Sequence, residues 1–149
     1  MMMKSNSDIK IILGDFNAKV GKEYIYKPTI GNESLHNETN NDRTKIIQFA
    51  ISKGFNVRST FPHKDIHKET WYSADGKTAN EIDHVSISNR FRSGITNIRA
   101  LRGPGTGSDH NLLMINFKVK SRVKTEKKYN EKRKIVNFFK IQSGNKNML

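Results

Sequence analysis

The sequence contains no cysteine among its 149 residues, so neither a disulfide framework nor a metal site with thiolate ligands can form. The first residues, Met1–Ser5, lack the apolar region of a secretory signal peptide. No apolar run approaches the length needed to span a bilayer. These absences favour an intracellular protein, nuclear or cytoplasmic, that is neither secreted nor inserted in a membrane.

Apolar residues are also scarce. They make up 34% of the chain, which is low for a globular protein, so we expect part of the chain to lie outside the hydrophobic core. A length of 149 residues suits one domain with a modest core, or part of a larger domain.

Positive charge is abundant but unevenly distributed. The formal net charge is +13, and residues 118–149 alone contain 11 basic and 2 acidic side chains. The rest of the chain is therefore only mildly basic. A tail of this kind is either a solvated extension or an electrostatic contact to nucleic acid. Within it, residues 129–139 are compatible with a short amphipathic helix.

The hydrophobic pattern predicts about six strands and one helix. Apolar residues at helical spacing between Ile46 and Ile51, followed by Gly54, indicate the helix. Ala74-Asp75-Gly76-Lys77 is a hairpin signal. We expect strands near residues 8–14, 55–60, 69–73, 78–88 and 94–102, and a last strand of strict alternation that ends at 120. The expected fold is α/β, or α+β by its connectivity, with a mostly antiparallel sheet.

Polar residues with chemical potential follow or precede three of these strands. Asp15 and Asn17 end the first strand, Asp83 and His84 lie in the second arm of the hairpin, and Ser108-Asp109-His110 precedes the last strand. Taken singly, each group has an ordinary explanation as a turn, a cap or a strand edge.

Taken together, these groups suit the hydrolysis of a phosphodiester. That reaction needs a metal to neutralise phosphate charge, a group that orients or deprotonates water, and hydrogen-bond donors for the transition state. Magnesium prefers carboxylates and water as ligands. An imidazole that is held by a carboxylate has a fixed tautomer, and Asp83 with His110 would form such a pair.

Three motifs in the same order, GDFNAKVG, NEIDHVSI and GSDHNLLMI, resemble the last three motifs of the endonuclease/exonuclease/phosphatase superfamily. The segment FPHKDIHKETWYSADGKTANEIDHVSI is similar to craniofacial development protein 2-like proteins and to retrotransposon-derived apurinic endonuclease domains. The resemblance covers about residues 9 to 120. Each motif is moderately specific, and the ordered set is highly specific.

The resemblance implies a role for five residues. Asp15 matches the residue that faces the attacking water, and Asn17 matches the residue that contacts the scissile phosphate. Asp109 matches a metal-linked carboxylate, and His110 the imidazole that contacts the phosphate or activates the nucleophile. Asp83 matches the aspartate that hydrogen-bonds this imidazole.

Three further residues have weaker or structural interpretations. Trp71 matches a position near the substrate face, but a place in the core is the favoured interpretation. His84 directly follows Asp83, and strand alternation turns it to the opposite face, so we expect it to be structural. Glu81 stands where relatives often carry glutamine.

The resemblance also implies a missing part. In the family, an asparagine, a metal-binding glutamate and a tyrosine precede the Gly-Asp-Phe-Asn strand, which here begins close to Met1. We therefore expect residues 1–120 to be the C-terminal part of a four-layer α/β sandwich, and residues 121–149 to be a basic linker or tail.

The expected function is a truncated Mg²⁺-dependent DNA endonuclease that is inactive as an isolated chain. Its partners would be DNA and a missing N-terminal half of the domain. The alternative is a non-catalytic remnant or a nucleic-acid-binding or interaction module.

Overall fold

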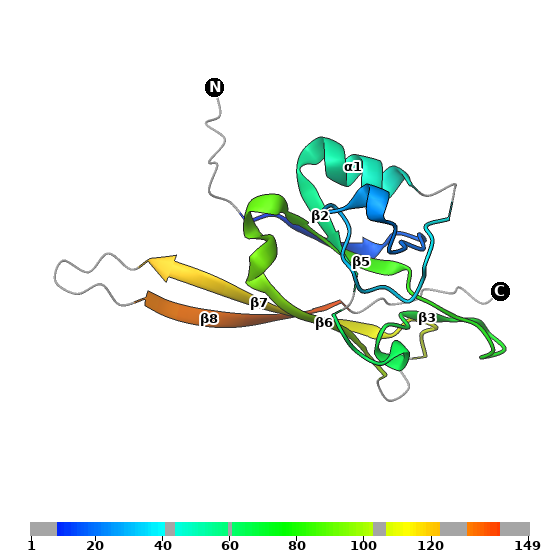
Figure 1. Cartoon of the computed structure of the whole chain (residues 1–149). Helices are drawn as coiled ribbons and strands as arrows, with labels where there is room; N and C mark the ends of the chain where they lie inside the picture. Colours follow the sequence, from blue (N-terminus) through cyan, green and yellow to red (C-terminus); the bar gives the residue numbers. More distant parts are fainter. Residues whose placement is uncertain (1–8, 41–43, 60, 103–106, 123–130, 141–149) are drawn as a thin grey trace, which may run out of the picture.

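The computed structural model describes residues 9–40, 44–59, 61–102, 107–122 and 131–140, with side-chain surroundings described up to Val119. These residues form one α-helix, three short 3₁₀ helices and eight strands (Figure 1). In chain order the elements are β1 (Ile11–Asp15), η1 (Tyr24–Tyr26), α1 (Lys45–Lys53), β2 (Phe55–Arg58), η3 (Asp65–His67), β3 (Trp71–Tyr72), β4 (Ala79–Asn80), β5 (Asp83–Ser88), η4 (Asn89–Gly94), β6 (Ile95–Leu101), β7 (Leu112–Arg122) and β8 (Glu131–Lys140).

The strands form three sheets, and every pairing between named strands is antiparallel. Two sheets have three strands, in the orders β1-β5-β2 and β6-β7-β8, and β3 pairs with β4 alone. Figure 1 shows α1 on one side of the β1-β5-β2 sheet and the β6-β7-β8 sheet on the other. The expected α/β or α+β class with antiparallel sheets is confirmed.

The helix α1 lies where the apolar spacing predicts it. It ends at Gly54, whose φ of 67° is the left-handed conformation that closes many helices. Its buried residues, Ile47 and Ala50, pack against one side of the β1-β5-β2 sheet at Val57, in a cluster that also includes Val20 from the loop after β1.

A second apolar cluster joins the two larger sheets. Val85 and Ile87 project from the other side of β5 and pack on fully buried residues of β6 and β7, among them Ile98, Leu113 and Ile115. Because side chains alternate along a strand, Val85 and Ile87 face this second cluster, while the buried polar residues His84 and Ser86 face the opposite side of β5. The central position of β5 fixes where its first residue, Asp83, lies.

The hairpin is shorter than its sequence suggests. Only Trp71 and Tyr72 pair with Asn80 and Ala79, and the expected second arm is split into β4 and β5. The break occurs because the backbone at residue 82 leaves β3 and bonds elsewhere: Ile82 N–H donates to Thr70 Oγ1 at 3.0 Å, and Ile82 C=O accepts from Phe16 N–H at 3.1 Å.

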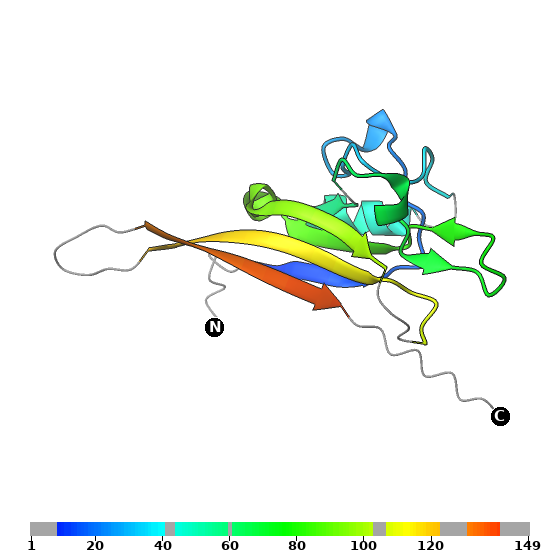
Figure 2. The same cartoon turned by 90° about the horizontal axis from the view of Figure 1, so that it is seen from below.

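The expectation of a helix over residues 129–139 is wrong for residues 131–139, and residues 129–130 lie outside the described residues. Residues 131–140 form β8, which pairs with β7 from Leu113↔Lys140 to Arg122↔Glu131. Figure 2 shows the two strands side by side as a long ribbon. The edge of β7 offers unpaired backbone groups, and the β-branched and aromatic residues of Ile135–Phe139 suit a strand. Sheet structure therefore continues past residue 120, and a domain boundary at that position stays a prediction.

Among the described residues, no helix is both long enough and apolar enough to cross a membrane.

Candidate active site

The last residue of β1 and the first residue of β5 lie side by side. Asp15 is the register partner of Asp83, because the antiparallel pairing brings the end of one strand to the start of the other. The Asp83 side chain is only 3% exposed, whereas that of Asp15 is 17% exposed. One carboxylate is therefore sealed in the protein and the other borders solvent.

His110 completes this cluster from the segment that precedes β7. Its Nδ1 lies 2.9 Å from Asp83 Oδ2, and its Nε2 lies 3.9 Å from Asp15 Oδ2. The shorter distance is that of a hydrogen bond, in which Nδ1–H donates to the carboxylate. This bond sets the tautomer of a neutral imidazole and directs Nε2 toward Asp15.

Strand β3 holds the segment that carries His110. Trp71 forms an antiparallel bridge with His110. On either side of this bridge, Tyr72 N–H donates to Asp109 C=O at 2.9 Å, and Asn111 N–H donates to Thr70 C=O at 2.8 Å. The position of the imidazole is thus set by a short strand far away in sequence.

Asp109 is exposed beside His110, and Trp71 contacts its carboxylate. The indole Nε1–H donates to Asp109 Oδ2 at 3.0 Å. Trp71 is partly exposed, so the interpretation of a core tryptophan is wrong. The indole lies at the candidate site because its N–H can reach a hydrogen-bond partner there.

Asn17 lies next to Asp15 in a left-handed conformation with φ of 50°. Asparagine tolerates this conformation better than most residues. Its backbone N–H donates to Asp15 Oδ1 at 2.8 Å, and the residue is exposed. This turn orients the Asp15 carboxylate and presents Asn17 at the surface beside it.

The described residues contain no group of three or more histidine, aspartate or glutamate side chains that could hold a metal ion. Asp109 is chemically suitable as one ligand, since Mg²⁺ binds through one or two carboxylates and keeps several waters.

Sequence reasoning missed Thr70. This fully buried residue accepts hydrogen bonds at Oγ1 from the N–H groups of Ile82 (3.0 Å) and Asp83 (3.1 Å), and so positions the start of β5. A threonine before a tryptophan in a strand carries no local signal for such a role, because its partners lie more than ten residues away.

Sequence reasoning also missed a polar group on the outer side of β3. Arg102 donates from Nη2 to Glu69 Oε2 and from Nε to Tyr72 Oη, both at 2.8 Å. Tyr72 donates in turn to Glu69 Oε2 at 2.6 Å, and the hydrogen bond to Tyr72 raises the pKa of Arg102. The group ties β3 to the segment that follows β6.

His84 is structural, as strand alternation predicts. It is fully buried on the face of β5 opposite to Asp83, and its Nε2 lies 2.6 Å from Ala18 C=O. The two adjacent residues therefore serve different sides of the sheet.

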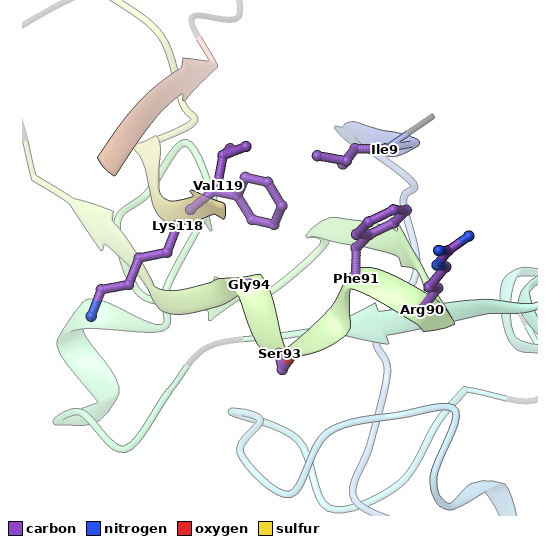
Figure 3. Close-up of a pocket in the computed structure, with 8 residues that line it drawn as sticks. Ile9, Arg90, Phe91, Ser93, Gly94, Lys118 and Val119 are labelled. Atoms are coloured by element: carbon purple, nitrogen blue, oxygen red, sulfur yellow. The ribbon is translucent and has the colours of Figure 1, made fainter. Parts of the chain in front are cut away.

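A hollow of about 390 Å³ lies between η4 and β7, away from this cluster. Figure 3 shows Ile9, Phe91 and Val119 around it, while Lys118 extends away. None of the five candidate site residues lines this hollow, so it is a separate feature.

Comparison with known proteins identifies relatives of one kind. The chain matches no protein-family model and, at a significant level, no solved structure. It is 31% identical over 117 residues to craniofacial development protein 2 of Bos taurus, a match that covers 78% of this chain and 19% of that protein. The protein of the same name from Tragulus javanicus is also 31% identical over 117 residues, or 20% of its length.

The chain thus spans about a fifth of the length of the curated relatives that it matches. The match extends over more than three quarters of this chain. Over the matched residues the chain is similar to craniofacial development protein 2, in agreement with the resemblance indicated by its motifs.

Proposed function

We propose that this chain provides the carboxylate–imidazole part of a Mg²⁺-dependent phosphodiester hydrolase that cuts DNA, as a retrotransposon-like, apurinic-type or nicking endonuclease. The observation that carries the proposal is the row formed by Asp83, His110 and Asp15, with His110 bonded to one carboxylate and turned toward the other. An intracellular location, nuclear or cytoplasmic, belongs to the same proposal.

The buried carboxylate holds the imidazole in place. Asp83 accepts the Nδ1–H of His110, and because it is almost fully buried it cannot easily reorient. The imidazole then presents Nε2 on the side of Asp15. In this geometry His110 hydrogen-bonds a phosphate oxygen or the attacking water, as the tautomer permits.

The exposed carboxylate serves the nucleophile. The 3.9 Å between His110 Nε2 and Asp15 Oδ2 is too long for a direct hydrogen bond, so both groups remain able to bind a third atom. We assign that place to the oxygen of the attacking water, which Asp15 orients. Asn17, exposed next to Asp15, contacts the scissile phosphate through its carboxamide.

Asp109 is the residue of this chain that would bind magnesium. When bound, Mg²⁺ neutralises charge on the phosphate. Since the described residues offer no group of three metal-ligating side chains, we propose that the isolated chain does not cleave DNA. Activity would require a segment that adds ligands, in the manner of the N-terminal half of the family domain.

The experiment compares the isolated chain with a chimera. The chimera joins this chain to the sequence that precedes the matched region in craniofacial development protein 2. Both are incubated with supercoiled DNA and with DNA containing abasic sites, in Mg²⁺ with and without chelator. We expect chelator-sensitive nicking by the chimera and none by the isolated chain.

A His110→Ala chimera serves as the control, because the substitution removes the imidazole from a partly exposed site. Nicking that survives in this variant would contradict the proposed role of His110. Nicking by the isolated chain that depends on metal and on His110 would instead refute the need for additional ligands.

A second candidate function is a non-catalytic module that binds nucleic acid. The absence of a group of three or more metal-ligating side chains among the described residues and the formal charge of +13 favour it. The chimera experiment separates the two candidate functions. A hydrolase gives a chimera that nicks DNA, whereas a binding module binds DNA in a salt-dependent manner and gives an inactive chimera.

A further inference from the structure

A second hollow, of about 370 Å³, lies along the outer edge of β2, on the opposite edge of its sheet from β1 and Asp15. The segment that follows η1 borders this hollow, because Ile30 forms a parallel bridge with Val57 of β2. We call it the edge pocket. The polar and aromatic side chains that line it include Tyr24, Lys27, Asn32, Asn56, Arg58 and Arg92.

The edge pocket is positively charged and has no acidic lining residue. Its three cationic side chains come from three separate elements: Lys27 follows η1, Arg58 ends β2, and Arg92 belongs to η4. Lys27 already donates from Nζ to Gly31 C=O at 2.5 Å and to Asn32 Oδ1 at 2.6 Å. Lys27 therefore stabilises the wall of the edge pocket, and the two arginines remain to donate hydrogen bonds to an anion.

The positive charges of Arg58 and Arg92 repel each other, and a bound anion would relieve this repulsion. Arg58 Nε is buried and has no hydrogen-bond partner among the described residues. Burial lowers the pKa of Arg58, and the positive charge of Arg92 lowers it further. Two guanidinium groups that face one hollow match the oxygen geometry of a phosphate, which accepts paired N–H donors.

An exposed aromatic ring stands at the same pocket. Tyr24 is 90% exposed, and the neighbouring Ile25 is 81% exposed. A large exposed ring beside arginines is the usual composition of a site that stacks a base and holds its phosphate. Tyr24 thus adds a second, independent indication of the ligand.

We propose that the edge pocket binds a nucleotide unit, with its phosphate against Arg58 and Arg92 and its base stacked on Tyr24. The ligand is a nucleotide of a single strand or a free mononucleotide, since both carry the same phosphate and ring. The site does not depend on the proposed hydrolase activity, because none of its residues belongs to the His110 cluster.

The test titrates the full chain with inorganic phosphate, AMP and a short oligothymidylate at constant ionic strength, and follows backbone amide signals by NMR. Arg92→Met is the principal variant, because Arg92 is exposed and its loss should leave the fold intact. We expect it to lose about tenfold in affinity for all three ligands, the effect of a lost charge-assisted hydrogen bond. Tyr24→Ala should weaken AMP and the oligonucleotide by about fivefold and leave phosphate unchanged.

Arg90→Met is the matched control. Arg90 lies two residues before Arg92 in the same 3₁₀ helix, but it lines the other hollow and stands over the Phe91 ring (Figure 3). Equal losses in Arg90→Met and Arg92→Met would overturn the site, since they would show attraction by net charge alone. Equal AMP affinity in the wild type and Tyr24→Ala would overturn the stacking role.

The relative affinities identify the source of the nucleotide. Tighter binding of the oligonucleotide than of AMP, with competition between them, would show a strand as the ligand. Tighter binding of AMP would show a free nucleotide. Failure of all three ligands to shift signals from the pocket would refute the proposal without affecting the proposed hydrolase.

Discussion

Glu81 and Asp83 stand two residues apart, and each belongs to a cluster that contains an imidazole, but the two clusters are built differently. Asp83 uses its side chain to accept a hydrogen bond from His110 Nδ1. At Glu81 the imidazole bonds the backbone instead, since Glu81 N–H donates to His36 Nε2 at 3.2 Å. His110 borders solvent and has a second carboxylate, Asp15, nearby.

The Glu81 carboxylate is fully buried and serves the chain that surrounds it. Its Oε2 accepts from Leu35 N–H at 2.7 Å and from Ser34 Oγ at 3.2 Å. These bonds attach the loop that follows η1 to the start of β5. The Glu81 cluster is structural because its carboxylate is buried and is occupied by the surrounding loop. The His110 cluster is available for chemistry because it borders solvent and its imidazole faces a second carboxylate.

The largest expected effect concerns catalysis in the His110 cluster. In the chimera, His110→Ala should lower the rate of nicking by about 10²- to 10⁴-fold, the usual contribution of a general acid or base. The free energy of unfolding should fall by only about 1–3 kcal/mol, because the buried Asp83 carboxylate loses the Nδ1–H donor of His110 but the fold otherwise keeps its contacts. Nicking assays and urea denaturation measure the two quantities. If His110→Ala unfolds the protein enough to explain the loss of nicking, His110 is structural in the same way as Glu81.

The next effect concerns stability in the Glu81 cluster. Glu81→Ala should lower the free energy of unfolding by about 2–4 kcal/mol, because it removes the acceptor of the partly buried Leu35 N–H and of the buried Ser34 hydroxyl. Glu81→Gln keeps an oxygen acceptor and should cost only about 1 kcal/mol. Urea denaturation of both variants checks this. Equal losses would show that charge, and not the acceptor, holds the loop.

The smallest effect is a pH dependence that arises at His36. Burial, together with the nearby positive charges of Lys19 and of His84 when protonated, lowers the pKa of His36 from 6.5 to about 4. Protonation would also remove the acceptor for Glu81 N–H. Below pH 6.5 the unfolded chain therefore binds a proton that the folded protein binds only near pH 4, so the free energy of unfolding falls as the pH falls through this window.

The half-buried position of His36 reduces the size of this effect by solvent screening. We expect a loss of roughly 1–2 kcal/mol between pH 7 and pH 4.5. His36→Gln lacks the titrating group, so urea denaturation should show a smaller decline with pH for this variant than for the wild type. Parallel declines would assign the pH dependence of stability to groups other than His36.

The sequence by itself determined the local features of this protein. Apolar spacing and Gly54 located α1, strict alternation located β7, and the motifs around Asp15, Asp83 and His110 indicated the family. These signals are readable because hydrogen bonds within a helix, side-chain alternation and turn chemistry depend on residues that are close in the chain. The same alternation assigned His84 to the structural face of β5.

Only the tertiary structure decided which distant residues meet. His110 and Asp83 are 27 residues apart, and their contact depends on β3 holding the segment before β7. The meeting of Arg58 and Arg92 at the edge pocket and the hydrogen bonds of Thr70 also join residues that are distant in the sequence. Residues 131–140 form a strand and not a helix because the edge of β7 offers a partner for their backbone groups. Such contacts depend on how whole strands pair across the chain, and no local window of sequence contains that information.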